Sequence, residues 1–373
     1  MIKKAKKGLA LTAACVMAAS CLAGCGTKID STEVVATVEG TEIPMGVAAM
    51  YARYQQASVY YMYGTYYGMT QIFDMVTDYE TYATYGETMK DSLLDTLEEM
   101  YILKNHADDY DVALTEEEVA AAEEAAKKFV TDNDAEVLEA IGTTEEDVAE
   151  LFQLYKYQSK MYAAMVEDVD TEVSDDEAKQ SALTYVKFAL TTSDEEGNSV
   201  TMTEEEMEAQ NDLAEEVLAK VAEQDDIAAA DMDALAKEVS EDLAATTTTY
   251  DDESTHIDSE VLLAVAGLED GELVDEVVMS SDGTALYVVR FDADLDREAT
   301  DTEKASIVTT RQQEDYEAEL TEWKEAAEIS VNEKVWKKIT LNDSQVFTIA
   351  EEAEEDAADE TDTTDDASSD VEE

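Results

Sequence analysis

The chain has 373 residues, of which 92 are acidic and 24 are basic, so its formal net charge is −68. This charge argues against nucleic acid as a partner, because binding phosphate groups requires basic side chains that displace counterions. A hydrophobic content of 45% is enough for a folded core, and the length suggests two domains or three.

The N-terminus predicts an exported lipoprotein. Four lysines among the first seven residues precede an uncharged apolar run at 8–24, which is shorter than the ~20 residues of a membrane-spanning helix. The run ends in Leu-Ala-Gly before Cys25, which matches the lipobox of lipoprotein signal peptides; Cys21 is the weaker alternative. We therefore expect cleavage before Cys25 and a lipid on its thiol that anchors the chain to the outer face of a membrane, with an uncleaved N-terminal anchor as the alternative.

The first half of the chain reads as a short strand pair followed by helices. Residues 34–38 and 41–43 have strand character, and the single proline, Pro44, opens a helix near Met45. The pattern stays helical to about residue 169. Capping boxes, in which a hydroxyl and a carboxylate satisfy free N–H groups, are expected at Thr115 with Glu118, Thr143 with Glu146, and Ser174 with Glu177.

The second half predicts a small α+β domain and then a return to helix. A β-rich run at 185–190 precedes a helix capped by Thr203 and Glu206, two shorter helices, and a hairpin formed by 277–279 and 285–291. A helix over 302–327 and a strand-like 329–331 follow. The acidic end of the chain has no basic residue after 351, which is typical of a disordered tail.

Several of these segments resemble the PrsA/SurA family of exported foldases. The segment VVATVEGTEI at 34–43 with its following helix resembles the start of the family, and SDDE at 174–177 resembles the entry into its middle domain. LEDGELV at 268–274 is similar to a segment of parvulin peptidyl-prolyl isomerases, and WKEAAEISVN at 323–332 looks like the closing helix and strand. The resemblance spans residues 33–340.

The resemblance implies an α+β fold in which a mostly helical chaperone module, built from N- and C-terminal segments, carries an inserted parvulin-like domain. It implies unfolded exported polypeptides as partners. We expect no cofactor. The expected segments are a signal peptide at 1–24, a lipidated linker at 25–32, a helical chaperone segment at 33–177, a parvulin-like domain at 178–297, the completing helix and strand at 298–345, and a disordered acidic tail at 346–373.

The chain departs from the parvulin pattern where catalysis would occur. Parvulins resemble one another in a histidine on the first strand and another on the last, where this chain has Lys187 and Val288. Its histidines, His106 and His256, lie elsewhere in the sequence. We therefore expect weak or no isomerase activity and assign no catalytic residue. A pocket working with substitute residues would consist of Tyr185, Lys187, Tyr287 and Val288.

More than half of the 19 tyrosines lie between residues 51 and 85, together with several methionines. Tyrosine and methionine offer apolar contact without demanding one partner shape, which suits a cradle for unfolded clients. The alternative is that these rings pack against the C-terminal helix, or against a second copy of the chain in a homodimer. The candidate client-binding residues are Tyr60, Tyr61, Met62, Tyr63, Tyr66, Tyr67 and Met69.

A different class of function remains open, namely a non-enzymatic acidic surface lipoprotein that binds cations or an envelope partner. Asp292, Asp294, Asp296 and Glu303 have the spacing of four ligands of a calcium loop, but Arg297 stands where the loop requires glycine. Among 92 acidic residues such a spacing arises easily by chance, so no metal site is assigned.

Overall fold

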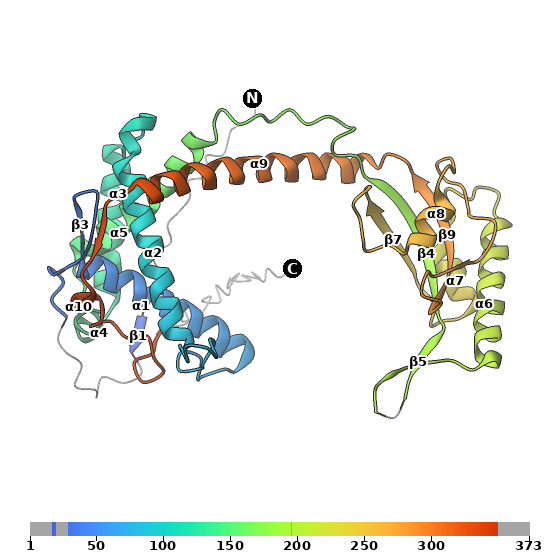
Figure 1. The fold of residues 1–373 in the computed structure, drawn as a ribbon, viewed down its shortest axis with the longest axis horizontal. Helices are drawn as coiled ribbons and strands as arrows, with labels where there is room; N and C mark the ends of the chain where they lie inside the picture. The colour runs from blue at the N-terminus through green and yellow to red at the C-terminus, as the bar shows by residue number, and fades with distance from the viewer. Residues whose placement is uncertain (1–16, 20–28, 195, 350–373) are drawn as a thin grey trace, which may run out of the picture. The chain divides into compact units, whose positions relative to one another are not determined.

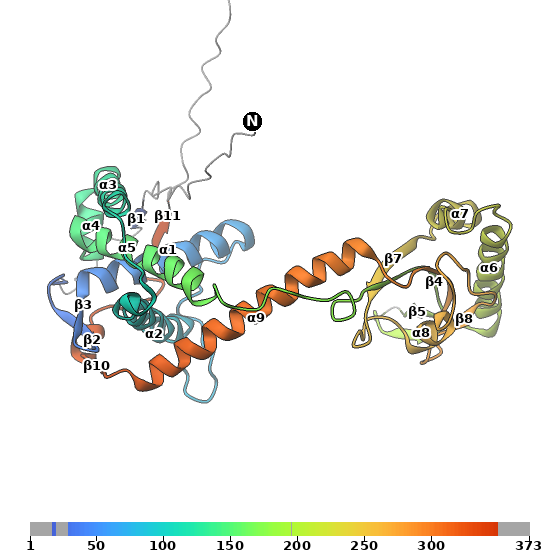
Figure 2. The ribbon, with the colours of Figure 1, turned by 90° about the horizontal axis from the view of Figure 1, so that it is seen from above.

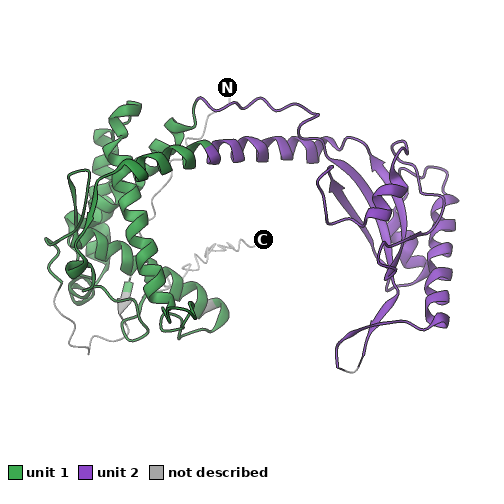
Figure 3. Ribbon diagram, viewed as in Figure 1, with its two compact units in different colours: residues 1–167, 315–373 green, residues 168–314 purple. Residues whose placement is uncertain are grey.

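The computed structural model describes residues 17–19, 29–194 and 196–349, and its fold is α+β (Figure 1). The chain forms two compact units (Figure 3). Unit 1 runs to Glu167 and resumes at Asp315, and unit 2 comprises 168–314. Cys25, most of the predicted signal peptide and the tail from residue 350 lie outside the described residues.

Unit 1 contains a three-stranded antiparallel sheet in the order β10-β2-β3. Strands β2 (Val34–Val38) and β3 (Thr41–Pro44) are joined by Glu39 and Gly40, whose φ angles of 50° and 85° both suit a tight hairpin turn. Strand β10 (Ile329–Val331) arrives from the other end of the chain and pairs with β2. The sheet therefore joins the two segments of unit 1 that flank unit 2.

Helices supply most of unit 1. One expected cap lies one residue further on: the structure has the capping box at Thr144 and Asp147 instead of Thr143 and Glu146. The reason is that Gly142 adopts a left-handed conformation and ends the preceding helix, so the chain re-enters helical geometry only after Thr144. The helices are α1 (Met45–Tyr67), α2 (Tyr85–Asn105), the 3-10 helix η1 (Ala107–Tyr110), α3 (Glu116–Asp132), α4 (Ala135–Ile141) and α5 (Glu145–Met165).

The C-terminal segment closes the core of unit 1. Helix α9 (Arg297–Ala326) begins in unit 2 and ends in unit 1, where the Trp323 ring stacks on His106 with centroids 4.3 Å apart. Helix α10 (Glu333–Trp336) and strand β11 (Phe347–Ile349) follow. The predicted disordered tail from 346 is wrong over its first residues, because Phe347 is buried and β11 forms there.

Unit 2 is built on a four-stranded antiparallel sheet in the order β7-β4-β9-β8. Successive side chains along β4 and β9 point to opposite faces, which creates two small cores. Helices α6 (Glu204–Ala222) and α7 (Met232–Val239) cover one face, and α8 (Ser259–Val265) covers the other. The strands are β4 (Ser181–Ala189), β7 (Ala245–Tyr250), β8 (Val278–Met279) and β9 (Ala285–Ala293), with a separate hairpin of β5 (Thr191–Ser193) and β6 (Ser199–Thr201).

The boundaries of unit 2 extend beyond the expected 178–297 on both sides. Residues leading into the unit are tied to α9, because Arg297 pairs with Asp175 at 2.7 Å and Arg311 pairs with Glu177 at 2.5 Å. Ser174 accepts the backbone N–H of Glu177, as the expected cap requires, but a turn follows it instead of a helix.

Candidate functional site

Exposed apolar side chains gather in one part of unit 1. Among the described residues, eleven large hydrophobic side chains are exposed, and eight of them lie between residues 62 and 82. Such clustering on a folded protein usually marks a binding surface. We call these eight the Tyr/Met surface: Met62, Tyr66, Tyr67, Met69, Met75, Val76, Tyr79 and Tyr82.

The Tyr/Met surface is formed by the end of α1 and by the segment that connects it to α2 (Figure 1). Helix α1 stops at Gly68, whose φ of 64° is readily adopted only by glycine. The N–H of the next residue, Met69, donates to the Tyr63 carbonyl at 3.1 Å. The chain therefore turns sharply and exposes both the last turn of α1 and the connecting segment.

The backbone of the connecting segment is held in place by Asp343, a residue distant in sequence. The Asp343 carboxylate accepts the backbone N–H groups of Ile72, Phe73 and Asp74, each at 3.1 Å. Ile72 and Phe73 are buried in the core of unit 1, and the N–H of Gly86 donates to the Phe73 carbonyl at 2.9 Å. The exposed side chains are thus displayed on an anchored backbone.

The structure divides the candidate client-binding residues by exposure. Tyr66 and Tyr67 are exposed to 73% and 71%, and Met62 and Met69 are exposed as well. Tyr60, Tyr61 and Tyr63 are half-buried, and two of them, Tyr60 and Tyr63, pack against the core. Sequence reasoning left out of this set Met75, Val76, Tyr79 and Tyr82, which no helical or strand periodicity connects to α1.

The four residues of the predicted substitute pocket do not share one face of the sheet of unit 2. The Tyr185 and Tyr287 rings meet edge to face with centroids 5.5 Å apart, and Lys187 Nζ lies 5.9 Å from the centre of the Tyr287 ring. Val288 is fully buried in the core on the opposite face, because adjacent residues of a strand point in opposite directions. Neither face has a histidine on β4 or β9.

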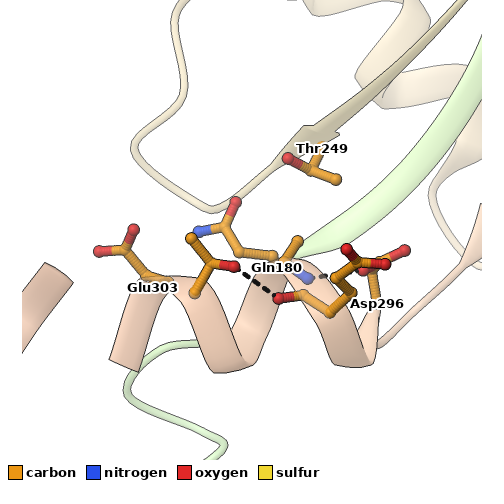
Figure 4. A pocket seen from close by; sticks show the side chains of 7 residues that line it. Gln180, Thr249, Asp296 and Glu303 are labelled. Atoms are coloured by element: carbon orange, nitrogen blue, oxygen red, sulfur yellow. Dashed lines mark hydrogen bonds between the residues drawn. The ribbon is translucent and has the colours of Figure 1, made fainter. Parts of the chain in front are cut away.

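A shallow pocket in unit 2 lies where β7 and the start of α9 approach (Figure 4). Asp296 caps α9 there by accepting the N–H of Ala299 at 2.8 Å, so its carboxylate has a structural role. The pocket is lined by Gln180, Thr249, Asp296, Glu298, Ala299, Thr302 and Glu303.

The carboxylates with calcium-loop spacing do not converge. Asp292 pairs with Arg290 at 2.5 Å, Asp294 pairs with Lys179 at 2.7 Å, and Glu303 lies on α9. Most of residues 292–303, which would have to form the calcium loop, belong to strand β9 and helix α9 instead. Across the described ranges, no three histidine, cysteine or acidic side chains gather closely enough to hold a metal ion.

The chain is similar to solved structures of PrsA and SurA-like chaperones. Foldase PrsA from Streptococcus pneumoniae is 20% identical, covering 68% of this chain and 92% of its own, with a TM-score of 0.28. PrsA from Lactococcus lactis is 12% identical, covering 82% and 96%, with a TM-score of 0.32. A structure from the report of PEB4 and Cj1289, two SurA-like chaperones of Campylobacter jejuni, is 10% identical, covering 80% and 99%, with a TM-score of 0.27.

No protein-family model and no curated protein matches the chain. All three TM-scores lie below 0.5 and all three identities below 25%. None of the helices in the described part of the chain combines the length and the apolar character needed to cross a bilayer.

Proposed function

We propose that this protein is an extracytoplasmic holdase chaperone, anchored to a membrane through lipid on Cys25, with weak or no prolyl-isomerase activity. The observation that carries the proposal is the Tyr/Met surface. Eight large apolar side chains are exposed on a backbone that Asp343 and the core hold in place. Its partners would be unfolded exported polypeptides, whose apolar segments are exposed before folding.

The residue types of this surface suit clients of varied sequence. Methionine is flexible and polarisable, and tyrosine offers a broad ring with a polar edge, so both adapt to partners of different shape. The high negative charge favours solubility and opposes association between copies of the chain. Together these properties allow an apolar binding surface to remain exposed to clients without the chains associating with one another.

The sheet of unit 2 supports the second half of the proposal. Rotation about a prolyl bond has a barrier of ~20 kcal/mol, and lowering it requires specific side chains in a shaped, partly dry site. Tyr287 contacts the Tyr185 ring and lies near the Lys187 ammonium group, and neither β4 nor β9 has a histidine. Unit 2 would then contribute mainly to the shape of the chaperone, with the Tyr/Met surface of unit 1 as the main client contact.

Suppression of aggregation tests the holdase activity. A reduced, unfolding model protein is followed by light scattering with and without the mature chain at near-stoichiometric ratio. Suppression is expected with the natural chain and is expected to be lost when Tyr66, Tyr67, Tyr79 and Tyr82 are replaced by serine. These side chains are highly exposed, so their removal leaves the core intact.

The matched control removes exposed apolar side chains elsewhere. Val200, Leu263 and Met279 of unit 2 are also exposed, and their replacement by serine should leave suppression unchanged. Equal loss in both variants would show that general surface hydrophobicity accounts for the effect. Absence of suppression by the natural chain would refute the holdase proposal.

A further inference from the structure

A short strand from the predicted signal peptide is built into unit 1. Strand β1 (Met17–Ala19) pairs antiparallel with β11, so that Met17 lies opposite Ile349, Ala18 opposite Thr348 and Ala19 opposite Phe347. Figure 2 shows the two strands side by side. In the described part of the chain, the sheet that contains β11 has β1 as its second strand and no third.

Met17 lies in a well-defined site made by the core of unit 1 and by Asn133. Its side chain is only 2% exposed and belongs to the core cluster of unit 1. Its backbone N–H donates to Asn133 Oδ1 at 2.6 Å, and Asn133 is itself buried. The amide group of Asn133 donates to the Phe129 carbonyl at 2.7 Å, which orients Oδ1 as an acceptor for the strand.

Cleavage before Cys25, which is part of the proposed function, would remove this strand. The edge of β11 would lose its pairing partner, and the position of Met17 would be vacated. An edge strand with unpaired N–H and C=O groups is a template for another extended chain. A buried apolar position beside such an edge adds a preference for an apolar side chain.

We propose that β11, Asn133 and the vacated Met17 position form a strand-docking site for an extended apolar segment of a client polypeptide. The proposal rests on the processing in the proposed function, and it adds a second contact to the Tyr/Met surface. In the precursor, residues 17–19 fill the site. Processing would therefore also open the chaperone to clients.

The bound strand indicates what the site accepts. Backbone groups pair with β11 and with Asn133, and these contacts demand no particular sequence. One unbranched apolar side chain, that of Met17, enters the core. The expected ligand is an extended antiparallel segment that carries a flexible apolar residue.

Disulfide trapping tests the site in the processed lipoprotein, kept in detergent. Thr348→Cys places a thiol opposite the position of Ala18. The probe is a peptide with the sequence of residues 14–22, in which serine replaces both cysteines and cysteine replaces the first of the two adjacent alanines after methionine. We expect trapping about tenfold faster than with Ser344→Cys, an exposed position outside β11.

Two further measurements separate specific docking from adventitious contact. A probe with aspartate in place of methionine should be trapped about tenfold more slowly, because the charge would have to enter the core. The Cys25→Ala precursor, which keeps residues 17–19, should bind a fluorescent, cysteine-free form of the probe about tenfold more weakly than the processed chain. Equal trapping at 344 and 348, or equal binding by precursor and processed chain, would overturn the proposal.

The outcomes also separate this site from the holdase activity. Suppression of aggregation without selective trapping at 348 would overturn the strand-docking site and leave the Tyr/Met surface as the client contact. Selective trapping without suppression would support the site and refute the holdase proposal. If the probe does not bind because another segment of the chain or a second copy fills the site, the proposal that clients dock there is overturned.

Discussion

Glu98 is a buried carboxyl group on α2 with an unsatisfied oxygen. Its side chain lies in the core of unit 1, and Oε1 has no hydrogen-bond partner. Burial and, to a smaller extent, the nearby Asp95 carboxylate raise the pKa of Glu98 to about 7, against the opposing effect of Lys324. The folded state therefore binds a proton at Glu98 more tightly than the unfolded state does.

The pKa of Glu98 leads to a prediction about pH and stability. Because the folded-state pKa lies above the unfolded value of 4.5, the contribution of Glu98 to stability falls as pH rises from about 5 through about 7. Glu98→Gln should match the natural chain near pH 4 and be more stable by about 1–2 kcal/mol at pH 8. Urea unfolding at both pH values measures the difference.

Glu99 provides the matched control for this prediction. Its carboxylate is adjacent in sequence but is more exposed and pairs with Lys324 at 2.5 Å. Glu99→Gln should therefore leave stability unchanged or lower it slightly, by under about 1 kcal/mol. A gain in Glu99→Gln equal to that in Glu98→Gln would point to relief of general charge repulsion instead of burial.

At the scale of elements, the start of α2 packs against the C-terminal segment with no space for a side chain. A Cβ on Gly86 would lie 1.9 Å from the backbone oxygen of Leu341. Gly86→Ala should therefore separate α2 from this segment and destabilise unit 1 by roughly 3 kcal/mol or more. Thermal unfolding measures the loss.

Gly64 gives the opposite expectation in the same unit. It lies within α1, and a Cβ there would meet its nearest neighbour, the Tyr60 ring, at an ordinary 3.6 Å. Gly64→Ala should be neutral or stabilise by about 0.5–1 kcal/mol, because alanine loses less backbone freedom in a helix. Equal destabilisation by both substitutions would contradict the close packing at Gly86.

The residues on the sheet of unit 2 lead us to expect little or no activity in a prolyl-isomerase assay. With Lys187 and Val288 on opposite faces and no histidine on β4 or β9, a proline-containing tetrapeptide should isomerise at, or only slightly above, the uncatalysed rate. A rate typical of active parvulins would show that other residues catalyse the reaction. In that case Lys187→Ala, measured beside Lys179→Ala, would test whether the Tyr185–Tyr287 face is the site.

For the whole molecule, the net charge of −68 predicts different salt responses for different clients. A basic unfolded client gains from long-range attraction, which salt screens, whereas an acidic client is repelled. Raising the salt from about 20 mM to about 500 mM should weaken binding of the basic client severalfold and strengthen or preserve binding of the acidic one. Titration by fluorescence anisotropy distinguishes the two.

Features that depend on neighbours in sequence could be predicted from the sequence. The capping boxes at Thr115 with Glu118 and Thr203 with Glu206 are confirmed, since each is closed by groups three residues apart. The strand 285–291 and the opening of α1 after Pro44 are confirmed for the same reason. Together with the α+β class, these are short-range properties of residue type and spacing.

Features that depend on distant partners were decided only by the tertiary structure. Asp343 anchors the backbone at Ile72 and Phe73, about 270 residues away, and so fixes the segment that connects α1 to α2. Phe347 is ordered in a strand next to an acidic tail sequence because its side chain is buried in the core of unit 1, against α1. Burial is a property of what surrounds a side chain, and periodicity along the chain does not contain that information.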